Sequence, residues 1–102
     1  MLQDLYIYLK TLDTRVEMGK MMSSPGITYK GKVFLFEYKD KIVFKLGKGF
    51  DISSYGIESF EYLNPFKKKG PMLAWYVVED KYKSTFEDLS KVALDHMKDT
   101  IK

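Results

Sequence analysis

The side chains that most often carry out chemistry are few and scattered in this sequence. His96 is the only histidine and the chain has no cysteine, so it lacks a thiolate nucleophile and the group of imidazoles or thiolates that holds zinc. We expect His96 to lie at the surface or boundary of a C-terminal helix. The acidic pairs Glu37/Asp40 and Glu79/Asp80 adjoin predicted turns, where solvated carboxylates are common. None of these residues predicts a catalytic centre or a metal site.

Cofactor motifs are also missing from the sequence. The stretch Gly47-Lys48-Gly49 lacks the G-x-x-x-x-G-K-[ST] spacing that cradles phosphate groups, so we interpret it as a flexible exit from a strand. We therefore expect a protein that is not an enzyme and binds no cofactor. A small-ligand-binding protein or an enzyme of unrecognised type stays open as an alternative.

A basic stretch, Lys67-Lys68-Lys69, stands between Pro65 and Pro71 and is followed by Trp75, the only tryptophan. All basic residues except Arg15 are lysine, whereas base-edge recognition favours the planar guanidinium fork of arginine. We expect the three lysines, a weak candidate anion patch, to form a hairpin tip. We expect Trp75 to be largely buried and nucleic-acid affinity to be negligible at physiological salt, with weak non-specific binding as the alternative.

Length and composition indicate one folded domain spanning residues 1–102. The fractions of hydrophobic (45%), aromatic (16%) and charged (30%) residues are ordinary for a protein with a core and far from those of disordered chains. The N-terminus shows no basic region followed by a long apolar run, and no segment is apolar enough to span a membrane. We expect a cytoplasmic protein with no membrane partner.

Apolar periodicity predicts a two-layer α+β fold with helices on one face of an antiparallel sheet of about five strands. Leucines recur at helical spacing near the N-terminus, alternation marks the strands, and Ser84-Thr85-Phe86-Glu87 fits a capping box before the last helix. The predicted order is α-β-β-β-α-β-β-α, with helices at 2–13 and 85–100, a helical turn at 51–56, and strands at 26–29, 32–38, 41–46, 59–63 and 72–78. The residues expected in the core include Leu5, Leu9, Phe44, Leu89 and Val92.

The strand at 32–38 is apolar on both sides. Strict alternation places Phe34, Phe36 and Tyr38 on one face and Val33 and Leu35 on the other. The second face is expected to lie under a dimer mate or under the Met18/Met21/Met22 segment of the same chain, whose thioethers suit irregular contacts. We therefore predict a protein-interaction module that binds a protein partner, itself, or both. The candidate interaction surface consists of Met21, Met22, Phe34, Phe36 and Tyr38.

Short motifs resemble the N-terminal domain of the TfoX (Sxy) family of competence regulators. They are the run KMMSSPGITYKGKVF at 20–34, where the family usually has Phe-Gly-Gly in place of Met22-Ser23-Ser24, then GIESFEY at 56–62, KGPM at 69–72 and WYVV at 75–78. The resemblance covers about residues 17–98. It implies a two-layer α+β domain with little chemistry of its own. It also implies a stand-alone N-terminal regulatory module, because the family's C-terminal domain would need additional chain.

Overall fold

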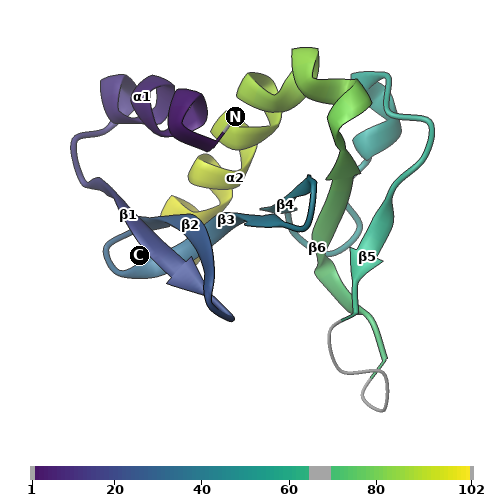
Figure 1. Cartoon of the computed structure of the whole chain (residues 1–102), viewed down its shortest axis with the longest axis horizontal. Coiled ribbons are helices and arrows are strands. Elements are labelled where there is room, and N and C mark those ends of the chain that lie inside the picture. Colours follow the sequence, from purple (N-terminus) through teal and green to yellow (C-terminus); the bar gives the residue numbers. More distant parts are fainter. Residues whose placement is uncertain (1, 65–69, 102) are drawn as a thin grey trace.

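The computed structural model describes residues 2–64 and 70–101, and shows two helices lying over one side of a strongly curved sheet (Figure 1). Within the described residues, two 3₁₀ segments accompany the helices and strands. In chain order the elements are α1 (Leu2–Leu12), β1 (Val16–Met21), β2 (Ser24–Tyr29), β3 (Lys32–Tyr38), β4 (Lys41–Lys45), η1 (Ile52–Tyr55), β5 (Glu61–Leu63), β6 (Met72–Glu79), η3 (Asp80–Thr85) and α2 (Phe86–Thr100).

All strand pairings are antiparallel, and the spatial order is β1-β2-β3-β4-β6-β5. The predicted α+β class is therefore confirmed, with both helices packed on the same side of the sheet. In the described part of the chain the sheet has six strands, because residues 16–21, for which no strand was expected, form an additional edge strand. The predicted tip at Lys67-Lys68-Lys69 lies outside the described residues.

Apolar spacing determines how the two helices pack. α1 buries Leu2, Leu5 and Leu9 along one stripe, and α2 buries a longer stripe that includes Leu89 and Ala93. α1 lies against β1 and α2, while α2 lies across β3 and β4. The predicted burial of Leu5, Leu9, Phe44 and Leu89 is confirmed, whereas Val92 is only partly buried at the boundary of the core.

A β-bulge in β3 changes which side chains share a face. Ile27 pairs with Leu35 and Thr28 pairs with Val33, so Phe34 has no partner residue on β2. The extra residue places both Phe34 and Leu35 in the core beneath the helices. The prediction that Phe34 and Phe36 lie on one face is therefore wrong, because a bulge shifts the two-residue alternation by one position.

The opposite side of the sheet, here called the helix-free face, has its own apolar cluster. Phe36, Val43, Leu63, Trp75 and Val77 are buried there, and Met21, Val33, Tyr38, Met72 and Ala74 pack around them at partial exposure. The edge of the Phe36 ring meets Trp75 at 5.6 Å between ring centroids. Phe36 is fully buried, because neighbouring side chains of the chain itself cover the centre of this face.

The first hairpin ends in a two-residue turn of unusual composition. Met22 and Ser23 join β1 to β2, and their φ angles are +51° and +70°. Two positive φ angles are required by a type I′ turn, whose preferred residues are Asn and Gly. The next hairpin uses Lys30 and Gly31, where glycine satisfies one of the two positions.

The connections to the last helix differ from the sequence prediction in one respect. The predicted helical turn at 51–56 is confirmed as a 3₁₀ turn that ends at Gly56, whose φ is +79°. The predicted capping box is wrong, because no side chain of the described residues caps α2 and the Thr85 hydroxyl donates to the Tyr82 carbonyl oxygen at 2.7 Å. The 3₁₀ segment η3 leads directly into α2 and supplies the preceding turn.

Candidate interaction edge

The structure separates the residues of the predicted interaction surface. Phe34 and Phe36 are both completely buried, on opposite faces of the sheet, so neither is available to a partner. Met21 and Tyr38 are half-buried at the margin of the helix-free face. Met22 is 43% exposed at the tip of the first hairpin. The predicted surface therefore reduces to Met21, Met22 and Tyr38.

Trp75 is largely buried, as predicted, with 8% of its surface exposed. The Lys45 ammonium lies 5.6 Å from the centroid of the indole ring and covers part of it. A platform on which bases stack must present its aromatic face to the nucleic acid. The packed indole, covered in part by Lys45, therefore provides no such platform.

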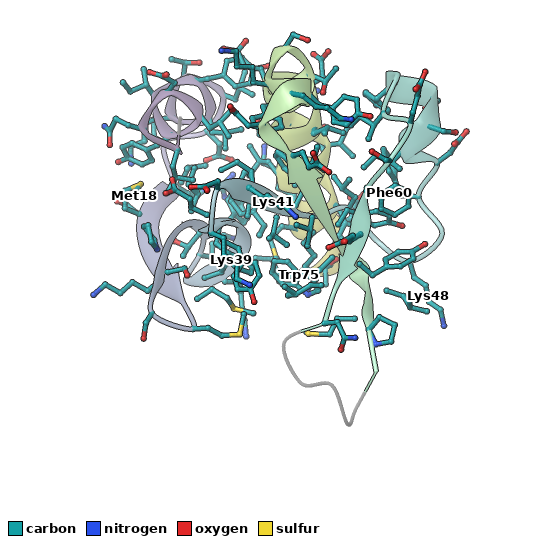
Figure 2. The ribbon with its side chains drawn as sticks, turned by 45° about the vertical axis from the view of Figure 1, so that its right-hand side comes forward. Met18, Lys39, Lys41, Lys48, Phe60 and Trp75 are labelled. Atoms are coloured by element: carbon teal, nitrogen blue, oxygen red, sulfur yellow. The ribbon has the colours of Figure 1, made fainter. Side chains whose placement is uncertain are left out.

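β1 is the longer of the two edge strands. It has six residues, whereas β5, at the other edge, has three. Met18, in the middle of β1, is 42% exposed and lies at the free edge of the sheet, on the opposite side of the view from Phe60 and Lys48 (Figure 2). Long edge strands present unpaired backbone groups to which another chain can add.

The orientation of the β1 backbone follows from two hydrogen bonds and one register pairing. Thr28, on β2, donates from its hydroxyl to the Glu17 carbonyl oxygen, which therefore faces β2. The Val16 carbonyl oxygen accepts a hydrogen bond from Lys10 and therefore faces away from β2. Lys20 lies opposite Pro25, which has no N–H to donate to the Lys20 carbonyl oxygen. Backbone direction alternates along an antiparallel strand. The N–H and C=O groups of Met18 and Lys20 consequently point away from the sheet.

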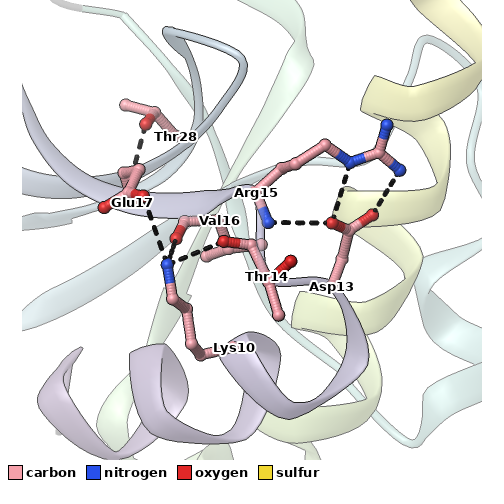
Figure 3. A network of polar contacts seen from close by, with 7 residues as sticks. All are labelled: Lys10, Asp13, Thr14, Arg15, Val16, Glu17 and Thr28. Atoms are coloured by element: carbon pink, nitrogen blue, oxygen red, sulfur yellow. Dashed lines mark hydrogen bonds and ion pairs between the residues drawn. The ribbon is translucent and has the colours of Figure 1, made fainter.

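A lysine of α1 closes the first part of this edge (Figure 3). The Lys10 ammonium donates to the carbonyl oxygens of Thr14 and Val16 at 2.8 and 2.7 Å, and it forms an ion pair with Glu17 at 3.2 Å. The outward carbonyl oxygen of Val16 is therefore already hydrogen-bonded to Lys10 and is less available to a partner chain. The open part of the edge begins at Met18, and we call residues 18–21 the open edge.

An ion-pair cluster holds the start of β1 in place. Arg15 binds the Asp13 carboxylate through two side-chain contacts of 3.0 and 2.9 Å and through its backbone amide at 2.9 Å (Figure 3). Lys98, on α2, contacts the same carboxylate at 3.2 Å. The hydrogen bonds from Arg15, aided by Lys98, hold the pKa of Asp13 well below its ordinary value. The α1–β1 connection is therefore tied to both helices.

The glycines of the first hairpin bring its strands and β3 close together. Gly19 and Gly26 are partners across β1 and β2. A Cβ atom on Gly26 would lie 2.8 Å from the Leu35 carbonyl oxygen, and one on Gly19 would lie 2.6 Å from the Thr28 methyl carbon. Both distances are shorter than real Cβ contacts allow, so side chains are excluded on this part of the helix-free face.

The residues considered for catalysis do not converge in the described chain. His96 is half-buried on α2, and its ring lies over Gly47, where an added Cβ would be 3.0 Å from Cε1. Glu79 and Asp40 are exposed at strand ends and turns. Within residues 2–64 and 70–101, no group of three acidic or histidine side chains is placed to hold a metal ion.

Two tyrosine hydroxyls have structural partners. Tyr76 donates to the Gly47 carbonyl oxygen at 2.9 Å, and burial raises the pKa of this phenol. Tyr82 accepts hydrogen bonds from the amides of Glu58 and Ser59, both at 3.2 Å. Hydrogen bonds from Ser59, first of all from its side chain, lower the pKa of Tyr82. Tyr76 therefore holds the loop at Gly47 against the sheet, and Tyr82 holds the loop at Glu58 and Ser59 against η3.

A hollow of about 510 Å³ lies between the N-terminal half of α1 and the start of α2. It carries more acidic than basic side chains. Its lining consists of Asp4, Leu5, Asp80, Lys83, Ser84, Phe86 and Glu87. Exposed carboxylates in such a place are ordinary solvated groups, and nothing in the described chain connects them with the open edge.

Comparison with known proteins gave no match to a family model, to a curated protein or to a solved structure. The resemblance to the TfoX N-terminal domain therefore stays a prediction. Among the described residues, neither helix combines the length and the apolar character needed to cross a bilayer.

Proposed function

We propose that the protein is a non-enzymatic interaction module that binds an extended segment of another protein chain along the open edge of β1. The single observation that supports this proposal best is the outward direction of the Met18 and Lys20 backbone groups on a six-residue edge strand. A segment that adds to such an edge gains main-chain hydrogen bonds, while alternate side chains give specificity.

The exposed methionines suit the same role. Met18 and Met22 are each more than two-fifths exposed, and thioether side chains adapt to irregular partner surfaces. Met22 also occupies a left-handed backbone conformation that costs an L-residue about 1–2 kcal/mol. Backbone strain of this kind clusters at ligand-binding sites, which supports a role for the hairpin tip in binding.

The other edge of the sheet is less suited to strand addition. β5 is short, and its register with β6 is interrupted between Tyr62 and Leu63. Short and irregular edges are the usual protection against unwanted pairing. The partner is therefore expected at β1, and a second copy of this chain is one occupant that the test can reveal.

A displayed library of short extended peptides provides the probe for this proposal. Peptides selected on the intact protein should shift the amide resonances of Met18 and Lys20 and should lose affinity for the Met18→Pro variant by about tenfold or more, because proline removes an outward N–H and blocks pairing. Met18→Val keeps the N–H and serves as the matched control. Sedimentation velocity of the unliganded protein shows whether a second copy occupies the edge.

Met18→Pro should remain folded, since proline is tolerated where the missing N–H faces solvent on an edge strand. Selected peptides that bind both variants equally, or that shift resonances only on the helices, would overturn the proposal. Failure to select any peptide, together with a strictly monomeric protein, would also count against it.

A further inference from the structure

A second hollow, of about 370 Å³, lies where the C-terminal end of α2 meets the helix-free face. We call it the end pocket. The volume is at the lower end of the range of about 300–1,000 Å³ that is typical of small-molecule sites. The lining consists of Met21, Gly31, Lys32, Val33, Lys45, Met97, Thr100 and Ile101.

The lining combines an apolar wall with positive charge. Met21 and Val33 come from the helix-free face and Met97 and Ile101 from α2, so the pocket lies at the junction of the two apolar clusters. Among the described residues of the lining, the titratable side chains are those of Lys32 and Lys45, which are both cationic, and none is a carboxylate. This composition is opposite in charge to that of the hollow between α1 and α2.

The two lysines are available to an anion. Within the described part of the chain neither forms an ion pair, and the Lys45 ammonium rests over the Trp75 ring instead. Lysine has a flexible stem with three donors on its ammonium, so each side chain can turn toward a ligand oxygen. An apolar wall beside two cations complements a molecule with an apolar body and one anionic end.

We propose that the end pocket binds a free aliphatic carboxylate, with its hydrocarbon chain against Met21, Val33 and Met97 and its carboxylate between Lys32 and Lys45. This inference does not rest on strand addition at β1, because strand addition uses the backbone groups of Met18 and Lys20, whereas the open edge contributes only the Met21 side chain to the pocket. The contacts require no catalytic step, and binding is reversible.

Methionine methyl groups provide a direct map of the site. In protein labelled at the methionine methyl carbons, octanoate should shift the Met21 and Met97 resonances and leave those of Met18, Met22 and Met72 in place. Octanamide has the same chain without the charge, and it should bind about two- to fivefold more weakly, as expected for partly exposed ion pairs. Added salt should reduce the difference between the two ligands.

Substitutions test the charge requirement. Lys32→Gln and Lys45→Gln should each weaken octanoate binding by about two- to fivefold without changing octanamide binding, whereas Lys20→Gln, outside the pocket, should change neither. Lys32 is exposed, so its substitution preserves the fold even if that of Lys45 does not. Equal affinity for octanoate and octanamide, or methyl shifts spread over all methionines, would overturn the proposal. The absence of any shift at Met21 and Met97 would overturn it as well.

Discussion

The turn between β1 and β2 allows a quantitative test of the backbone geometry. Ser23 has a φ of +70°, a conformation that costs an L-residue about 1–2 kcal/mol but carries no such cost for glycine. Glycine loses about 0.5–1 kcal/mol more chain entropy on folding than other residues do. Ser23→Gly should therefore raise the free energy of unfolding by about 0.5–1 kcal/mol, a gain that is rare for a substitution to glycine.

The same substitution at Ser53 is a matched control. Ser53 lies in η1 at a negative φ, and its hydroxyl donates to the Asp51 carboxylate at 2.6 Å. Ser53→Gly should therefore lower stability by about 0.5–1 kcal/mol. Chemical denaturation at constant m-value measures both effects, and the stabilised variant should melt about 2–8 °C higher.

Met22→Asn extends the test to the first position of the turn. Asparagine tolerates the left-handed region better than methionine does, so this change should add to the gain from Ser23→Gly. A destabilised Ser23→Gly variant would refute the left-handed turn and, with it, the argument that Met22 is held under strain.

Three further predictions concern the core, the glycine contact and the ion-pair cluster. Leu89→Ala should cost about 2–5 kcal/mol in chemical denaturation because Leu89 is fully buried; a shift near zero would contradict the register of α2. Gly26→Ala should cost about 1–3 kcal/mol because the new methyl group meets the Leu35 carbonyl oxygen, and unchanged stability would refute that contact. Because the pKa of Asp13 is lowered on folding, its contribution is present at neutral pH and is lost in acid. The stability difference between wild type and Asp13→Asn should thus shrink below about pH 4, and a difference independent of pH would exclude the ion pair.

Sequence patterns predicted the helices and most strands because these elements have clear periodicity and clear ends. Strand β1 was missed because its sequence, VEMGKM, contains a glycine and few β-forming residues, and the turn after it lacks Asn-Gly. It becomes a strand because β2 pairs with it and α1 packs on it. Tertiary contacts therefore determine the conformation of residues 16–21, which local sequence preference did not predict.

The candidate site was less predictable than the fold. Phe36 was expected at an interaction surface, but Trp75 and Tyr38 cover it. The bulge at Phe34 could not be recognised in the sequence, because the residues on both sides of it are also apolar and the pattern looks the same with or without the extra residue. The contact between Lys10 and the β1 edge could not be predicted either, because it depends on how β1 packs beneath α1.

Amide hydrogen exchange along β1 in the unliganded protein tests the central claim most directly. If the Met18 and Lys20 backbone groups point outward, their amides should exchange fast, while the amides of Glu17, Gly19 and Met21, which face β2, should be protected. A bound peptide should then slow exchange at Met18 and Lys20 alone. Uniform protection along β1 without a partner, or protection of Met18 in place of Gly19, would contradict the open edge and the function proposed for it.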